Sequence, residues 1–225
     1  RRPGMISPDA GDTIAAISTP PGEAGIGIVR LSGPEAVAIA HRLFRPHRPR
    51  PAWQSHRLYL GHIVDPQGEI IDEVLLTPMG APYTYTREDV VEINCHSGYG
   101  VLRRILDLAL AAGARLARPG EFTLRAFLSG RLDLTQAEAV LEVIRARTET
   151  HLQVAAAHLK GGLGQRLARG RQDLLDLLAR VEAALDFPEE AGELPPAAIQ
   201  AGLDVQLRTL EALAGSYESG RLLRE

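Results

Sequence analysis

The chain has 225 residues, a formal net charge of -3 and 45% hydrophobic residues, values typical of a soluble globular protein of one or two domains. No apolar run approaches the roughly 20 residues that a membrane-spanning helix needs, so we expect no membrane contact. The single cysteine, Cys95, excludes an internal disulfide, and without a signal-peptide pattern we expect a cytoplasmic location. Lys160, the only lysine, lies outside any P-loop pattern, which excludes a Walker-type nucleotide site in this sequence.

In chain order, the first half alternates short apolar runs with glycine and proline, the pattern of strands joined by turns. Two amphipathic segments interrupt these runs, and the second ends at Gly113. An α+β domain over roughly the first 120 residues is the expected result. The predicted strands cover 13–18, 25–32, 56–64, 66–79 and 89–97, and the predicted helices cover 33–44 and 100–113.

From about Leu134 onward the pattern is helical. Thr135 and Glu138 form a T-x-x-E capping box, which predicts one long helix from there to the Gly161-Gly162 break. A second helix stops before Pro188, and a third covers about 196–217. Such long amphipathic helices need partners to bury their apolar stripes. The residues expected to face inward in the first helix are Leu141, Ile144, Leu152, Ala155 and Leu159.

A few polar residues are candidates for a site. Arg30 ends an apolar strand and Glu92 alternates with apolar residues, so each belongs either to a binding pocket or to a solvated, ion-paired sheet face. Cys95 is interpreted as a small buried residue rather than a nucleophile, and the scattered histidines show no metal-ligand spacing. We therefore predict no catalytic residue and no metal ligand in this chain.

A second group of charged residues surrounds the predicted junction between the two halves. Domain junctions are frequent pocket sites, but an interdomain elbow held by ion pairs would give the same pattern. The sequence pattern leaves both interpretations open. The residues are Arg118, Glu121, Arg125, Arg131 and Asp133.

Several longer stretches of the chain are distinctive when taken together and in order: "DTIAAISTPPGEAGIGIVRLSGP", "REDVVEINCHSG", "ARPGEFTLRAFLSGRLDLTQAEAV", "VEAALDFPEE" and the final "GRLLRE". They run from Asp12 to Glu225 and are far more specific than a short motif. Together they resemble one family, the tRNA modification GTPases known as MnmE or TrmE, which act on wobble uridines.

The resemblance implies an α+β tetrahydrofolate-binding-like domain that also forms the homodimer, followed by part of an all-α helical domain. We assign 1–11 to an N-terminal extension, 12–120 to the folate-binding and dimerisation domain, and 121–225 to the helical domain. In the family, a Ras-like GTPase domain follows the "LLRE" motif, so we expect this chain to be part of a longer protein and to have no GTPase activity alone.

The same resemblance implies a function and a site. Family members bind a one-carbon tetrahydrofolate, such as 5-formyltetrahydrofolate, through contacts that carry over to Arg30, Glu92 and Arg131. The full protein is expected to use GTP, Mg2+ and K+, and to work with the flavoprotein MnmG. Together they would install an aminomethyl or carboxymethylaminomethyl group at C5 of the tRNA uridine.

The sequence departs from the family pattern at several positions, of which Arg87 matters most. Glycine is usual there, so a side chain at this position bears on the shape of the pocket near Glu92. Arginine at position 131 replaces the usual lysine and keeps the charge with a different geometry. Three alternatives stay open: a structural dimerisation scaffold with a lapsed folate pocket, an autonomous folate-dependent aminomethyl or formyl transferase, and direct RNA binding, which the net charge of -3 favours least.

Overall fold

The computed structural model describes residues 11–222, apart from 21, 23, 50 and 193, and for 190, 191 and 216–222 it describes the backbone alone. The chain divides after Leu132 into two compact units. The boundary is expected at 120 from the sequence, whereas this division places helix α3 (Glu121–Leu128) in the first unit, where Arg125 pairs with Asp12 and Glu88. Of the expected N-terminal extension, only Gly11 lies within the described residues.

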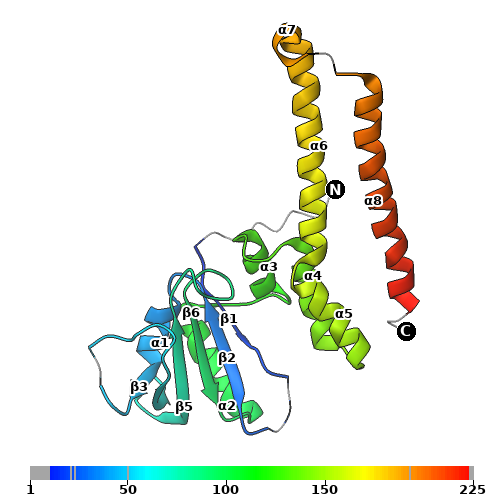
Figure 1. Cartoon of the computed structure of the whole chain (residues 1–225). Coiled ribbons are helices and arrows are strands. Elements are labelled where there is room, and N and C mark those ends of the chain that lie inside the picture. The colour runs from blue at the N-terminus through cyan, green and yellow to red at the C-terminus, as the bar shows by residue number, and fades with distance from the viewer. Residues whose placement is uncertain (1–10, 21, 23, 50, 193, 223–225) are drawn as a thin grey trace, which may run out of the picture. The chain divides into compact units, whose positions relative to one another are not determined.

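The first unit is built on one seven-stranded sheet with the strand order β3-β4-β5-β6-β2-β1-β7 (Figure 1). Every neighbouring pair is antiparallel except β1 and β7, which are parallel. The strands are β1 (Ile14–Ile17), β2 (Gly27–Ser32), β3 (Phe44–Pro46), β4 (Tyr59–Val64), β5 (Ile70–Met79), β6 (Val90–Cys95) and β7 (Arg115–Leu116).

Helices α1 (Ala36–Leu43) and α2 (Tyr99–Ala111) cover one face of this sheet. Alternate strand residues such as Val29, Ile93 and Leu76 are fully buried beneath them, as the period of two in a strand requires. The intervening residues point to the opposite face. On that face Ile14 and Val90 are also buried, and helix α3 is attached to the unit through Arg125, which pairs with Asp12 and Glu88.

The predicted α+β fold of this part is confirmed, and all five predicted strands and both predicted helices are present. Strands β3 and β7 and helix α3 were not predicted. They are short, and β7 exists only because its backbone pairs with β1: Arg115 N–H donates to the Thr13 carbonyl at 2.8 Å. Sequence periodicity carries no signal for a two-residue strand.

The second unit is helical, as predicted, but its first long helix is divided in two. Helix α4 begins after Asp133, which forms a capping box with Gln136, so the predicted Thr135–Glu138 cap is wrong. The helix ends at Arg145, and Thr148 caps a new one by accepting from His151 N–H. The helices are α4 (Leu134–Arg145), α5 (Glu149–Leu159), α6 (Gly162–Asp186), α7 (Pro188–Ala191) and α8 (Pro196–Leu222).

The predicted inward face of the first long helix is partly wrong. Ala155 is buried, whereas Leu141, Ile144 and Leu152 are each 46% or more exposed. Since α4 and α5 are separate helices, one continuous stripe cannot face a single neighbour. Most of the leucines described along α6 and α8 are also exposed, from 38% at Leu174 upward. Across the described residues, no helix combines the length and apolar character that crossing a bilayer requires.

Candidate ligand-binding site

Arg30 and Glu92 face each other across the central strands β2 and β6, where they are direct register partners. Arg30 Nε donates to Glu92 Oε1 at 2.8 Å, and its Nη2 lies 2.7 Å from the same oxygen. Both side chains are about a quarter exposed, on the sheet face opposite the helices α1 and α2. The two predicted residues therefore form one ion pair at the surface of the sheet.

Two aromatic side chains border this pair. The Arg30 guanidinium lies 5.6 Å from the centre of the Phe122 ring on α3 and 5.9 Å from that of Tyr85. The guanidinium of Arg131 lies 5.0 Å from the same Tyr85 ring, within cation–π range. Tyr85 thus lies beside both Arg30 and Arg131, and its hydroxyl is hydrogen-bonded to Thr123 Oγ1 at 2.9 Å.

The resulting site combines two guanidinium groups, one carboxylate and two aromatic rings. In the part of the chain that the structure describes, Glu92 Oε2 accepts no hydrogen bond, so it is available to a ligand that carries N–H donors. Arg131 is exposed, and its guanidinium is suited to an anionic group. The arrangement can therefore bind a flat, partly aromatic molecule with a donor edge and a negative charge. Tyr85 and Phe122 were not predicted from the sequence.

Arg87 adopts a positive φ of 62°, in the left-handed region that favours glycine. This explains physically why a glycine would suit the position. The backbone conformation costs an arginine roughly 1 kcal/mol. The Arg87 side chain donates from Nη1 to the Ser129 carbonyl at 3.0 Å, so it ties the segment 80–89 to the end of α3.

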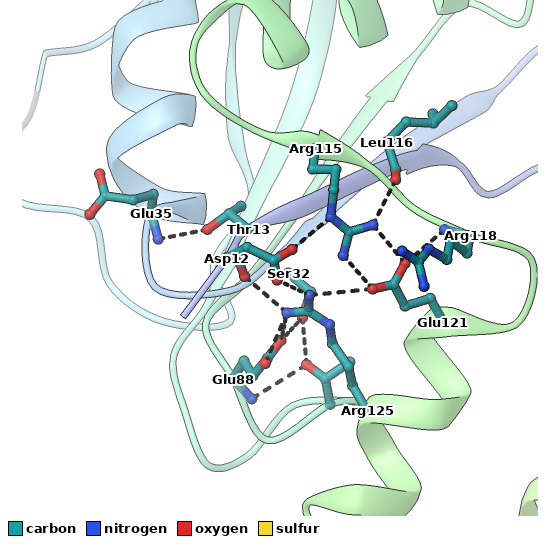
Figure 2. Close-up of polar contacts among 11 residues, drawn as sticks. Asp12, Thr13, Ser32, Glu35, Glu88, Arg115, Leu116, Arg118, Glu121 and Arg125 are labelled. Carbon is teal, nitrogen blue, oxygen red and sulfur yellow. Dashed lines mark hydrogen bonds and ion pairs between the residues drawn. The ribbon is translucent and has the colours of Figure 1, made fainter. Parts of the chain in front are cut away.

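A partly buried network of charges anchors α3 beside this site (Figure 2). Arg125, only 5% exposed, donates to Glu88 at 3.1 Å, to the Asp12 backbone carbonyl at 3.0 Å and to the Asp12 carboxylate. Arg115 donates to Asp12 at 2.7 Å and to Glu121 at 2.6 Å. Figure 2 shows the three carboxylates gathered around the two guanidinium groups. The network joins β7 and α3 to Asp12, two residues before β1.

The electrostatics of the network favour its charged form. Hydrogen bonds from Arg115 lower the pKa of Glu121 to about 2, although burial opposes the shift. Burial also opposes ionisation of Asp12, but hydrogen bonds from Arg115 and Arg125 lower its pKa overall. Among the described residues, Arg125 Nε is the one buried side-chain nitrogen or oxygen without a hydrogen-bond partner.

The positions of the charged residues near the predicted junction decide between the two interpretations of that junction, a pocket or an interdomain elbow. Glu121 and Arg125 lie inside the first unit and hold α3, the helix that presents Phe122 and leads to Arg131. Arg118 adds a backbone N–H to Glu121 at 2.7 Å. Asp133 belongs instead to the second unit, as the cap of α4. The ion pairs are therefore a support for the candidate site within one unit rather than an elbow between two.

Cys95 and His96 have no place in the site. Cys95 is 4% exposed, donates to the Gly27 carbonyl at 3.4 Å, and burial raises its pKa to about 11. It is a neutral buried thiol, as predicted. His96 is exposed and pairs with Asp72 at 2.7 Å, and that hydrogen bond raises the pKa of the imidazole.

Comparison with known proteins relates this chain to a family. The family model for the GTP-binding protein TrmE N-terminus matches residues 13–131, and the model for the MnmE helical domain matches residues 134–225. Curated relatives share about half of their residues with this chain. They include a tRNA modification GTPase MnmE of Chloroflexus aurantiacus, 54% identical over 213 residues, and that of Moorella thermoacetica, 52% identical over 217 residues.

The matches cover 95% of this chain but only 46% and 47% of those two relatives, so the chain spans about half the length of the curated relatives it matches. Neither family model that matches is a GTPase domain. On the strength of two consecutive family-model matches and more than 50% identity to named members, the chain belongs to the MnmE (TrmE) family of tRNA modification GTPases.

Proposed function

We propose that this chain binds a one-carbon tetrahydrofolate at Arg30, Glu92 and Arg131. The observation that supports this most is that Tyr85 lies beside the guanidinium groups of both Arg30 and Arg131, while Arg30 pairs with Glu92 on the open face of the sheet. The pterin ring of a folate is flat and has an edge of N–H donors, which suits a carboxylate beside aromatic rings. The carboxylates of the folate tail suit a guanidinium.

Each residue has a role in this proposal. Glu92 Oε2 accepts from the donor edge of the pterin, while Oε1 keeps the ion pair with Arg30 that fixes the carboxylate. Tyr85 and Phe122 offer apolar ring surface, and Arg131 holds an anionic group. The folate, when bound, would supply the one-carbon unit. The chain's own residues would bind and orient it.

The proposal extends to the whole protein of which this chain is a part. The relatives are named tRNA modification GTPases. We infer that the full protein works in the cytoplasm with the flavoprotein MnmG on C5 of tRNA wobble uridines, with GTP, Mg2+ and K+ used by a domain outside these residues. Because the sequence has no P-loop, the chain alone is expected to show no GTP hydrolysis.

A homodimer is also part of the proposal. Leu60 and Leu75 are register partners on β4 and β5, on the same open face as Arg30, and are 47% and 41% exposed. Apolar side chains at such positions support contact with a second copy. Light scattering tests this: Leu75→Asp should reduce the mass from dimer to monomer, while Leu116→Asp on β7 should not. A monomeric unmodified chain, or a dimeric Leu75→Asp variant, would contradict it.

One alternative is favoured by a specific observation. Arg30 and Glu92 pair with each other at 2.7 Å, so each satisfies the charge of the other, as in a structural dimerisation scaffold with a lapsed pocket. An autonomous folate-dependent transferase would need a nucleophile or a catalytic carboxylate near the one-carbon group. It lacks such support, because Cys95 is buried and its thiol is neutral.

Calorimetric titration with 5-formyltetrahydrofolate separates the two candidates. Glu92→Gln should weaken binding about 10- to 100-fold, since one hydrogen bond to a charged group contributes about 1.5–3 kcal/mol. Glu138→Gln makes the same chemical change at an exposed position on α4 and is the matched control. This variant should bind folate as the unmodified chain does. A folded chain that binds no folate favours the scaffold.

A further inference from the structure

Three polar side chains gather on the sheet of the first unit, on or beside strands that contribute no residue to the candidate folate site. They are His47, just after β3, His62 on β4 and Glu73 on β5. His47 Nε2 lies 3.4 Å from His62 Nε2 and 3.3 Å from Glu73 Oε1. His62 Nε2 lies 3.9 Å from the same carboxylate oxygen. Their three ligand atoms thus converge on one point.

The strand pairing brings these residues together. His62 and Glu73 are direct register partners in the antiparallel pair β4–β5, so their side chains share a face. His47 extends the β3–β4 ladder, because its backbone N–H donates to the Leu60 carbonyl at 3.0 Å. Gly61 permits this close approach, since a Cβ there would collide with the Arg45 carbonyl. The backbone therefore fixes all three positions.

The face that carries the cluster is the open one. Ile63 and Val74, the neighbours of His62 and Glu73 in sequence, are at most 2% exposed on the opposite face. The three cluster side chains are 30–53% exposed. An ion can reach the cluster from solvent, and no rearrangement of the core is needed to admit it.

The distances suit a tetrahedral metal ion. With metal–ligand bonds of about 2.0–2.1 Å, the ligand atoms of a tetrahedral site lie about 3.3–3.4 Å apart. Two of the three separations, 3.4 and 3.3 Å, have this length, and the third, 3.9 Å, needs a closure of only about half an ångström. Imidazole nitrogen and carboxylate oxygen are ligands of Zn²⁺, and two histidines with one glutamate leave a fourth position open.

The nearest basic residue does not oppose a cation at this point. Arg45 is the register partner of His62, but its Nη1 donates to the carbonyls of His41, Arg42 and Phe44 at 3.2–3.4 Å. Its guanidinium is therefore held at the end of α1, and the carboxylate of Glu73 supplies the net charge of the cluster.

We propose that His47, His62 and Glu73 form a binding site for a divalent transition-metal ion, with Zn²⁺ as the best-matched ion and one coordination position open to solvent or to a group of another molecule. The site is independent of the proposed folate site. The metal would also join the segment after β3 to β4 and β5.

The test is a titration of the metal-free chain with Zn²⁺ in competition with a chromophoric chelator. The unmodified chain should bind one Zn²⁺, and His47→Gln, His62→Gln and Glu73→Gln should each weaken binding at least about tenfold. His151→Gln on α5 is the matched control, because it removes an imidazole outside the cluster. His47 is exposed and outside any strand, so its variant should keep the fold, as the fluorescence of Trp53 can verify.

Co²⁺ provides a second readout, since the intensity of its visible absorption distinguishes tetrahedral from octahedral coordination. A tetrahedral spectrum that is lost in His62→Gln and kept in His151→Gln supports the proposal. Absence of Zn²⁺ binding, or binding that the cluster variants leave unchanged, would overturn it and leave the cluster as a hydrogen-bonded surface group.

Discussion

Replacing Arg125 by methionine is the substitution that should most damage the first unit. The change leaves Asp12, Glu88 and Glu121 with one guanidinium, that of Arg115, and removes the donors to the Asp12 carbonyl and the Glu88 carboxylate. Removing one partner of a fully buried ion pair costs about 3–5 kcal/mol. Asp12 and Glu88 are 25% and 33% exposed, and Arg115 still pairs with Asp12 and Glu121, so we expect a loss of about 3 kcal/mol in the free energy of unfolding, at the lower end of that range.

Urea unfolding followed by fluorescence measures this loss in the first unit alone. Trp53 is the only tryptophan, it packs against the core of the first unit, and its ring stacks on His41 at 3.6 Å. The control is Arg103→Met, which removes an exposed (i, i+4) pair with Asp107 and should cost less than about 0.5 kcal/mol. If Arg125→Met costs no more than Arg103→Met, the network does not hold α3 and our reasoning is wrong.

Two further predictions concern ionisation. The pKa of Glu121 is lowered from 4.5 to about 2, which corresponds to a stabilisation of the folded chain by roughly 3 kcal/mol. This stabilisation is complete above pH 4.5 and is lost as the pH falls towards 2. The stability of a Glu121→Gln variant should therefore fall less steeply with acid, and an equal slope in both proteins would contradict this. The Cys95 thiol, with a pKa of about 11, should react with a thiol reagent at pH 8 only after unfolding in urea, and rapid labelling of the folded chain would refute its burial.

The long elements of the fold could be predicted from periodicity, because burial against α1 and α2 imposes alternation on β2, β5 and β6. The helix break at Ala146 could not. After this break the Thr148 side chain caps a new helix. At the start of α4, likewise, Asp133 provides the cap in place of the predicted Thr135. Such choices between neighbouring caps depend on geometry that residue spacing does not record.

The candidate site, too, could be predicted only in part from the sequence. Residue types suggested that Arg30 and Glu92 were ligands or an ion pair, and the structure shows the pair. Tyr85 and Phe122 come from a loop and an unpredicted helix, so their approach to Arg30 depends on the fold of α3 over the sheet. The His47–His62–Glu73 cluster escaped prediction for a related reason: its members are neighbours across β3, β4 and β5 and far apart along the chain.

The most direct test of the central claim is calorimetric titration of this chain with 5-formyltetrahydrofolate, with its mass measured by light scattering in the same buffer. Our account predicts binding by a dimer, about 10- to 100-fold weaker in Glu92→Gln and unchanged in Glu138→Gln. Binding that Glu92→Gln leaves intact would contradict the assignment of the pterin to Glu92. An intact dimer that binds no folate would contradict the claim that this sheet face is a folate site.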